Sequence, residues 1–155
     1  MQKSSPPVEK TPLFPVIRPP RRLAQRRFRR YESFIMTRKL LFIVFTNEPC
    51  KRNHAFMHAL ALTKEGHTVR ILLEGEGTCS VADRKGHFGE MWADAAAQGL
   101  FIGACKAASC GCSSDDPSRD MTAQLEAEGL ALLDEMDGHA SINGYVADGF
   151  ELVIY

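Results

Sequence analysis

The sequence lacks the features of a membrane protein and of several common enzyme classes. Its longest strongly apolar run, Leu40 to Phe45, is far shorter than the roughly 20 residues that a membrane-spanning helix needs. The basic N-terminal stretch has no continuous apolar segment of the kind found in a secretory signal, so we expect no export. The sequence contains no P-loop, no Ser-His-Asp elbow motif and no HExxH motif. It therefore offers no nucleotide, serine-hydrolase or zinc-protease signature.

The formal net charge is zero, but the basic and acidic residues are segregated along the 155 residues. Residues 1–36 carry nine Lys or Arg and two Glu, whereas the rest of the chain carries ten basic and seventeen acidic residues. Six of the eight prolines lie in residues 1–20, where no helical or strand periodicity is present. We therefore predict a disordered, basic, Pro/Arg-rich extension over residues 1–37 and a single folded domain over residues 38–155.

The extension allows three interpretations. Its clustered arginines are suited to the phosphates of nucleic acid or of anionic lipid. An Arg-rich, acid-poor start is also typical of a transit peptide. The third interpretation, which we favour, is a dispensable extension, since Met36 stands just before the first predicted strand and would make a natural initiator.

The domain alternates apolar strand patterns with helical ones. Residues 39–46 form a continuous apolar run typical of a strand that is buried on both faces. Further strands are expected at 68–73, 100–104, 130–133 and 150–155. Helices are expected at 49–66, 89–98, 116–129 and 139–148, and a Gly-rich loop at 74–86. This alternation predicts an α/β fold with a mainly parallel five-stranded sheet that is covered by helices on both sides.

All five cysteines and one histidine follow predicted strands. They are Cys50, Cys79, Cys105, Cys110, Cys112 and His139. Because parallel sheets build their sites beyond the carboxyl ends of the strands, this placement indicates a thiol-based site at that edge. Five cysteines without a secretory signal indicate free thiols in a reducing compartment, the cytoplasm, rather than a disulfide framework.

Cys105 is the best candidate nucleophile because it comes directly after the third predicted strand. Backbone N–H groups of the following turn, and the adjacent Lys106, are expected to lower its pKa below the ~8.5 of a free cysteine. The alternative is a small buried apolar residue. Cys110 is either a resolving or second carrier thiol or a loop residue without a role. His139 is either a proton donor or a residue that caps and packs a helix.

Two metal-binding alternatives remain open. The spacing of Cys105, Cys110 and Cys112 misses the C-x4-C-x2-C iron–sulfur pattern by one residue and lacks the C-x2-C pair usual for zinc. Residues Cys50, His54 and His58 lie at i, i+4 and i+8, so they share one helix face that would suit a metal. That face is otherwise exposed to solvent or to another subunit.

Four segments give the domain a resemblance to the DsrE/DsrF-like family of small sulfur-relay proteins. They are NHAFMHALALTKEGHTVRILLEG (residues 53–75), GLFIGACKA (99–107), EGLALLDEMDGHAS (128–141) and GYVADGFELVIY (144–155). The resemblance covers residues 38–155 and excludes the extension. It implies a three-layer α/β/α sandwich that assembles as a homo-oligomer or with related subunits.

The resemblance also implies a chemistry. Several members of that family carry sulfur as a persulfide on a cysteine just after the third strand, where Cys105 falls. Similar sequences often have a second cysteine three residues later, but this position is Ala108 here and the next thiol is Cys110. The expected function is therefore a sulfurtransferase-like relay without a cofactor, in which Cys105 exchanges sulfur with the thiols of partner proteins. The alternative of another class is a non-catalytic oligomeric subunit.

Overall fold

The computed structural model describes residues 36–111 and 116–155. In these residues five strands form one sheet with the order β4-β3-β2-β1-β5, and every neighbouring pair is parallel. The strands are β1 (Lys39–Val44), β2 (Thr68–Leu73), β3 (Phe101–Cys105), β4 (Leu132–Leu133) and β5 (Glu151–Ile154). The predicted five-stranded parallel sheet is confirmed.

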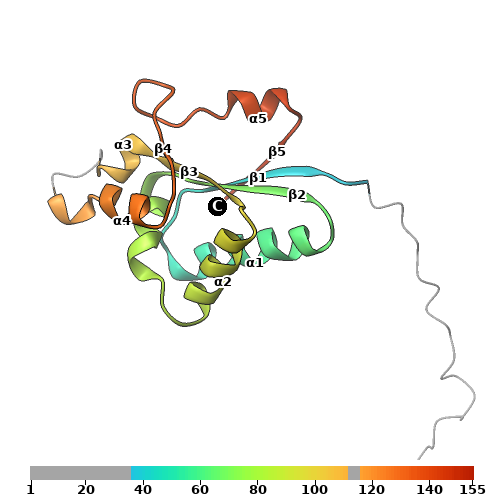
Figure 1. Ribbon diagram of the computed structural model, residues 1–155, viewed down its shortest axis with the longest axis horizontal. Coiled ribbons are helices and arrows are strands. Elements are labelled where there is room, and N and C mark those ends of the chain that lie inside the picture. Colours follow the sequence, from blue (N-terminus) through green and yellow to red (C-terminus); the bar gives the residue numbers. More distant parts are fainter. Residues whose placement is uncertain (1–35, 112–115) are drawn as a thin grey trace, which may run out of the picture. The chain divides into compact units, whose positions relative to one another are not determined.

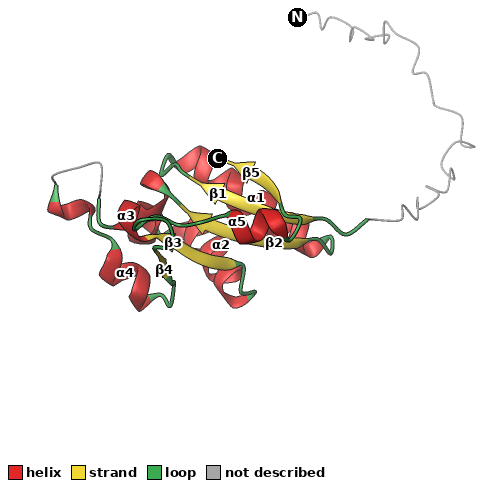
Figure 2. Ribbon diagram, turned by 90° about the horizontal axis from the view of Figure 1, so that it is seen from above, coloured by secondary structure: helices red, strands yellow, loops and turns green. Residues whose placement is uncertain are grey.

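Helices cover both faces of this sheet. They are α1 (Pro49–Lys64), α2 (Gly86–Ala97), α3 (Lys106–Ser109), α4 (Thr122–Ala127) and α5 (Asn143–Ala147), with the 3₁₀ helices η1 (Gly75–Asp83) and η2 (Pro117–Arg119). Helices α1 and α2 lie on one face and α5 on the other (Figure 1), and the view from above places α5 over β1 and β2 (Figure 2). The fold is thus the expected three-layer α/β/α sandwich.

The two faces of the sheet carry cores of very different size. On the α1/α2 face, Phe56 packs against Phe88 and Trp92, with ring centroids 5.0 and 5.9 Å apart. The core on the α5 face is small. Its buried residues are Leu41, Ile43, Leu72, Cys105 and Ala140. The best candidate nucleophile therefore lies in the thinner of the two cores.

Helix α1 begins where the sequence predicts, at Pro49. The carboxylate of Glu48 accepts hydrogen bonds from the backbone N–H groups of Cys50 and Lys51, both at 3.0 Å, which satisfies two donors of the first turn. Asn47 does not cap the helix; its Oδ1 accepts a hydrogen bond from Nη1 of the buried Arg52 at 2.9 Å. This pairing ties the loop after β1 to α1.

The segment after β2 differs from the predicted loop, because residues 75–83 form η1. Gly77 lets η1 pack directly on β1: a Cβ at this position would lie 1.9 Å from the carbonyl oxygen of Val44. The Thr78 hydroxyl also donates to the carbonyl of Gly75 at 2.9 Å. The prediction was wrong because Gly75 and Gly77 serve a tight backbone approach rather than an open loop.

Two predicted helices are shorter than expected. The helix predicted over 116–129 divides into η2 and α4, because Asp120 accepts hydrogen bonds from the backbone N–H and the hydroxyl of Thr122 and starts a new helix there. The helix predicted over 139–148 begins only at Asn143. Its expected first residue, His139, instead forms an antiparallel bridge with Met136.

The described residues, 36–111 and 116–155, belong to one compact unit. The predicted extension lies outside the described residues except for Met36 and Thr37, which belong to no helix or strand. None of the helices in the described part of the chain has the length and apolar character needed to cross a membrane.

Candidate functional site

A β-bulge in β3 decides which face of the sheet receives the Cys105 side chain. Strand β3 pairs with β2 through Ile71–Phe101 and then Leu72–Gly103, so one residue of β3, Ile102, has no counterpart. Regular alternation would put Phe101 and Cys105 on the same face. Instead, Phe101 and Ala104 pack with the α1/α2 core, whereas Cys105 belongs to the core under α5.

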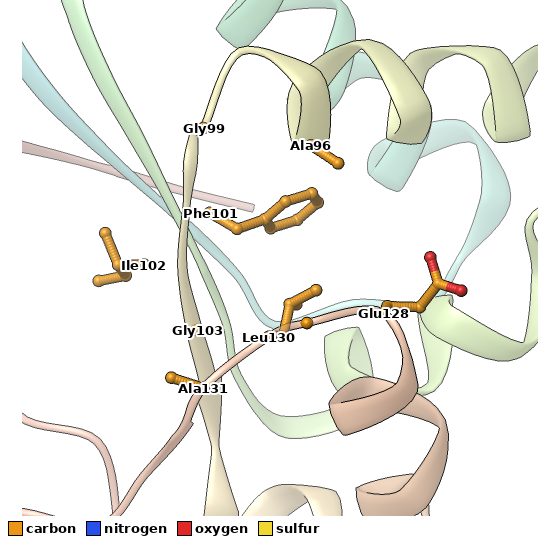
Figure 3. A pocket seen from close by; sticks show the side chains of 9 residues that line it. Ala96, Gly99, Phe101, Ile102, Gly103, Glu128, Leu130 and Ala131 are labelled. Carbon is orange, nitrogen blue, oxygen red and sulfur yellow. The ribbon is translucent and has the colours of Figure 1, made fainter.

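The bulge depends on Gly103. Its φ of +147° is one that residues with a side chain rarely adopt, and a Cβ there would lie 2.5 Å from the carbonyl oxygen of Ala131. The side chains of Phe101 and Ile102 point to opposite sides of the strand beside this glycine (Figure 3). Gly103 therefore directs the thiol towards α5.

Cys105 is the last residue of β3 rather than the first residue after it, and its side chain is buried, with 0% exposed. Its Sγ lies 3.6 Å from Nδ1 of His139. The backbone N–H groups of Ala108 in α3 and of Ala140 also donate hydrogen bonds to the thiol sulfur. Segments that follow β3 and β4 thus converge on one sulfur atom.

Glu74 is a further member of this site. The pairing of Leu72 with Gly103 and of Leu73 with Ala104 places the next residues, Glu74 and Cys105, side by side at the ends of β2 and β3. Both belong to the same face of the sheet as Leu72, because side chains alternate along β2. The negative charge of Glu74 acts on the Cys105 thiol, whose direct side-chain contact is with His139.

These surroundings raise the pKa of Cys105 above its ordinary value, so the prediction of a lowered pKa was wrong. Burial is the largest cause, because it penalises the thiolate. The N–H groups of Ala108 and Ala140 act in the opposite direction, and the negative charge of Glu74 adds to the rise. Cys105 therefore rests as a neutral thiol at neutral pH.

Lys106 does not assist the thiol in the expected way. Its ammonium group binds the carboxylate of Asp134 at 2.8 Å, and this contact raises the pKa of Lys106 and lowers that of Asp134. The pair instead joins α3 to the segment that follows β4. The backbone N–H of Ala107 strengthens this junction by donating to the carbonyl of Gly138 at 2.9 Å.

His139 lies in the segment between β4 and α5 and is exposed, unlike Cys105. Its backbone N–H donates to the carbonyl of Met136 at 2.9 Å, and the N–H of Met136 donates back to the carbonyl of His139. Ile142, not His139, precedes the first residue of α5. The helix-capping interpretation of His139 was therefore wrong, and its ring is left beside the thiol.

The other described cysteines, Cys50, Cys79 and Cys110, follow strands as predicted but do not join this site. Cys50, Cys79, Cys105 and Cys110 are all free. Cys110 is exposed at the end of α3, Cys50 is exposed in the first turn of α1, and Cys79 packs against the α1/α2 core. The prediction for Cys112 lies outside the described residues. Among the four described cysteines, only Cys105 combines burial at the strand edge with a neighbouring imidazole.

The stripe of Cys50, His54 and His58 does not form a metal centre. Sγ of Cys50 lies 3.6 Å from Nδ1 of His54, but that nitrogen also contacts the carbonyl oxygen of Cys50 at 2.8 Å. Nδ1 of His58 is 2.5 Å from the hydroxyl of Tyr155. Within residues 36–111 and 116–155, no three His, Cys, Asp or Glu side chains are grouped closely enough to hold a metal ion.

Two cavities lie away from the thiol. One of about 350 Å³ runs beside β3 and the chain before β4, between Ala96, Phe101 and Glu128 (Figure 3). Another of about 360 Å³ lies between α1 and β5, next to His58 and Tyr155. Neither of these two cavities is lined by Cys105 or His139.

Comparison of the chain with protein-family models, curated proteins and solved structures found no match.

Sequence reasoning identified Cys105 and His139 but missed Glu74. The residue stands in the segment EGEG, where it resembles the start of a polar loop. The available signal was its position directly after the second predicted strand. A carboxylate there shares an edge with the residue that ends the neighbouring strand.

Proposed function

We propose that this protein is a sulfur carrier that accepts sulfane sulfur on Cys105 as a persulfide and passes it to the thiol of a partner. The observation that carries the proposal is the Cys105–His139 pair at the carboxyl edge of the parallel sheet, with 3.6 Å between Sγ and Nδ1. The resemblance to the DsrE/DsrF-like family agrees with this role.

The chemistry is a thiol exchange that needs no cofactor. The sulfur of Cys105 attacks the terminal sulfur of a donor persulfide, a new S–S bond forms, and the donor's own S–S bond breaks. The electron pair of the broken bond leaves on the donor sulfur, which takes a proton from His139. The N–H groups of Ala108 and Ala140 are placed to hold negative charge on the Cys105 sulfur while the bonds exchange.

Burial of the thiol implies that a donor reaches it only after a local movement. The segment between β4 and α5 covers the site, and few contacts hold it. They include the exposed Lys106–Asp134 pair and the Ala107–Gly138 hydrogen bond. Such a thinly anchored segment opens at a low free-energy cost compared with the sheet. We infer that it opens to admit the donor and, later, the acceptor, and closes again for each transfer, which returns His139 and Ala140 to the thiol.

The proposed setting is the cytoplasm, where thiols stay reduced. The proposed form is a homo-oligomer, supported by the exposed apolar side chains of Leu152 and Ile154, which are 40% and 64% accessible on the edge strand β5. Light scattering at micromolar concentration is expected to give a mass above that of one chain. A monomeric mass throughout that range would contradict the assembly.

The test is exposure of the full-length protein to inorganic polysulfide, followed by peptide mass spectrometry. We expect an increase of about 32 Da, one sulfur atom, on the Cys105 peptide. The Cys105→Ser variant should lose this adduct, while Cys110→Ser and Cys112→Ser should keep it, because Ala108 already breaks the paired-thiol arrangement. Labelling that spreads evenly over all five thiols, or no adduct on Cys105, would favour a non-catalytic structural subunit.

A further inference from the structure

The buried position of Cys105 raises a question that the sulfur-carrier proposal leaves open: where the thiol proton goes when the sulfur attacks. A neutral thiol is a poor nucleophile, so the proton must leave before or during the attack. In an exposed site water would take it. In the closed site Cys105 has no exposed surface, so the acceptor there must be a group of the protein.

Four titratable or charged groups around the thiol come from three parts of the chain, because Asp134 and His139 share the segment between β4 and α5. Glu74 follows β2, Lys106 begins α3, Asp134 follows β4, and His139 stands in the segment before α5. Lys106 and Asp134 are engaged with each other. Of the two that remain, His139 serves the donor sulfur, and Glu74 stands at the neighbouring strand end on the face of the sheet that the thiol occupies. A carboxylate there can accept a proton from the thiol.

We propose that Glu74 is the proton acceptor of Cys105 in the sulfur-transfer step, an inference that rests on the proposed function. The register of β2 and β3 fixes the two residues side by side, and the bulge at Gly103 turns the thiol to the face that Glu74 occupies. The position of Glu74 beside Cys105 is thus fixed by the pairing of β2 with β3.

The proton of Cys105 passes to the Glu74 carboxylate as Sγ attacks the terminal sulfur of a donor R–S–S–H. The donor S–S bond breaks with its electron pair on R–S, and protonated His139 supplies the proton that makes R–S–H. The products are the Cys105 persulfide, R–S–H, neutral Glu74 and neutral His139. No electrons are gained or lost overall, and transfer to an acceptor thiol uses the same two groups.

Removal of the Glu74 carboxylate should change the rate of sulfur loading in opposite directions, depending on whether Glu74 is a base or only a nearby negative charge. If Glu74 accepts the proton, its loss slows sulfur loading most at low pH, where little thiolate forms unaided. If Glu74 only disfavours the thiolate, its removal increases the thiolate fraction and makes loading faster. The sign of the effect at low pH therefore separates the two roles.

The experiment measures the rate of polysulfide loading on Cys105, by peptide mass spectrometry, in the full-length wild type, Glu74→Gln and Glu74→Asp between about pH 6 and pH 9. The ratio of the loading rates of two proteins at the same pH is independent of the ionisation of the polysulfide, because that ionisation is the same for both. At pH 6 the wild type is expected to load about a hundredfold faster than Glu74→Gln, the low end of the contribution of a positioned base. The ratio should shrink towards one at high pH.

Glu74→Asp keeps a carboxylate and should recover part of the rate at low pH. Glu76→Gln is the matched control: it removes the same charge two residues later, where the side chain is exposed and contacts Arg119. It should follow the wild type at every pH.

Failure of this inference is distinguishable from failure of the sulfur-carrier proposal. If the wild type loads Cys105 but Glu74→Gln loads equally fast or faster at pH 6, Glu74 is not the base and the carrier role stands. If Cys105 of the wild type takes up no sulfur at any pH, the carrier role falls and the role of Glu74 falls with it.

Discussion

At the scale of single residues, the site protects its nucleophile instead of activating it at rest. Burial and Glu74 hold Cys105 as a thiol, and the two backbone N–H groups only partly oppose them. A carrier gains from this arrangement, because a thiolate left in contact with solvent would react with any oxidant or disulfide. Reactivity then depends on opening of the segment that bears His139 and on the arrival of a donor.

The raised pKa of Cys105 predicts a loss of stability at alkaline pH. The unfolded chain releases this proton near pH 8.5, whereas the folded protein keeps it to higher pH. Above that point the unfolded state binds fewer protons, so the free energy of unfolding falls as pH rises. The contribution is fully present at neutral pH and is lost as pH increases through the folded-state pKa.

The measurement is urea unfolding of the wild type and of Cys105→Ser from about pH 7 to pH 10. The wild type should lose more unfolding free energy over this range than the variant does, whatever the difference between them at pH 7. Parallel curves would show that the thiol has an ordinary pKa in the folded state.

At the scale of elements, the bulge in β3 connects backbone geometry to chemistry. One extra residue in the strand turns Cys105 away from the α1/α2 core and towards Glu74 and His139. Bulges of this kind often re-aim a side chain beside an active site. The site thus depends on a glycine that carries no functional group.

Gly103→Ala is expected to destabilise the protein by about 1–3 kcal/mol, since the new Cβ would meet the Ala131 carbonyl in a backbone conformation unfavourable to alanine. Sulfur loading on Cys105 should fall with it. Gly144→Ala is the matched control: it lies in α5 with open space around its Cα, so it should be neutral or slightly stabilising. Urea unfolding compares the three proteins, and equal stability of Gly103→Ala and wild type would contradict this account of the bulge.

Much of the element pattern could be predicted from the sequence, and the exceptions have physical causes. Apolar runs bounded by Gly and Pro revealed the five strands. Burial on both faces demands such runs in the central strands β1 and β2, whereas the edge strand β5 is largely exposed. The extents of η1 and α4 depend on contacts with distant segments, such as Gly77 against Val44, which local patterns do not contain. The bulge was signalled only by a lone glycine inside a strand.

The same limit applies to the candidate site. Cys105 and His139 could be found because the ends of parallel strands share an edge. Their contact, and the position of Glu74 beside them, required the register of β2 against β3. The pKa direction was predicted wrongly because adjacency to Lys106 in sequence says nothing of burial, or of the pairing of Lys106 with Asp134.

At the scale of the whole molecule, the site lies on the thinly covered face of the sheet. Aromatic packing of Phe56, Phe88 and Trp92 stabilises the α1/α2 face. The other face is covered by the short helices α5 and α3 and the segment between β4 and α5. Val146 of α5 and Ile154 of β5 remain 51% and 64% accessible. A rigid face and a weakly covered face suit a carrier, which must hold its thiol in place and still admit partners.

The central claim is that sulfur resides on Cys105 and moves on, and a chase experiment tests it most directly. Full-length protein is loaded with polysulfide, freed of excess reagent and mixed with glutathione. The account predicts that the mass of about one sulfur atom, 32 Da, leaves the Cys105 peptide as an equal amount of glutathione persulfide appears. Sulfur that never loads on Cys105, that stays there in the presence of glutathione, or that is transferred equally well by Cys105→Ser would contradict it.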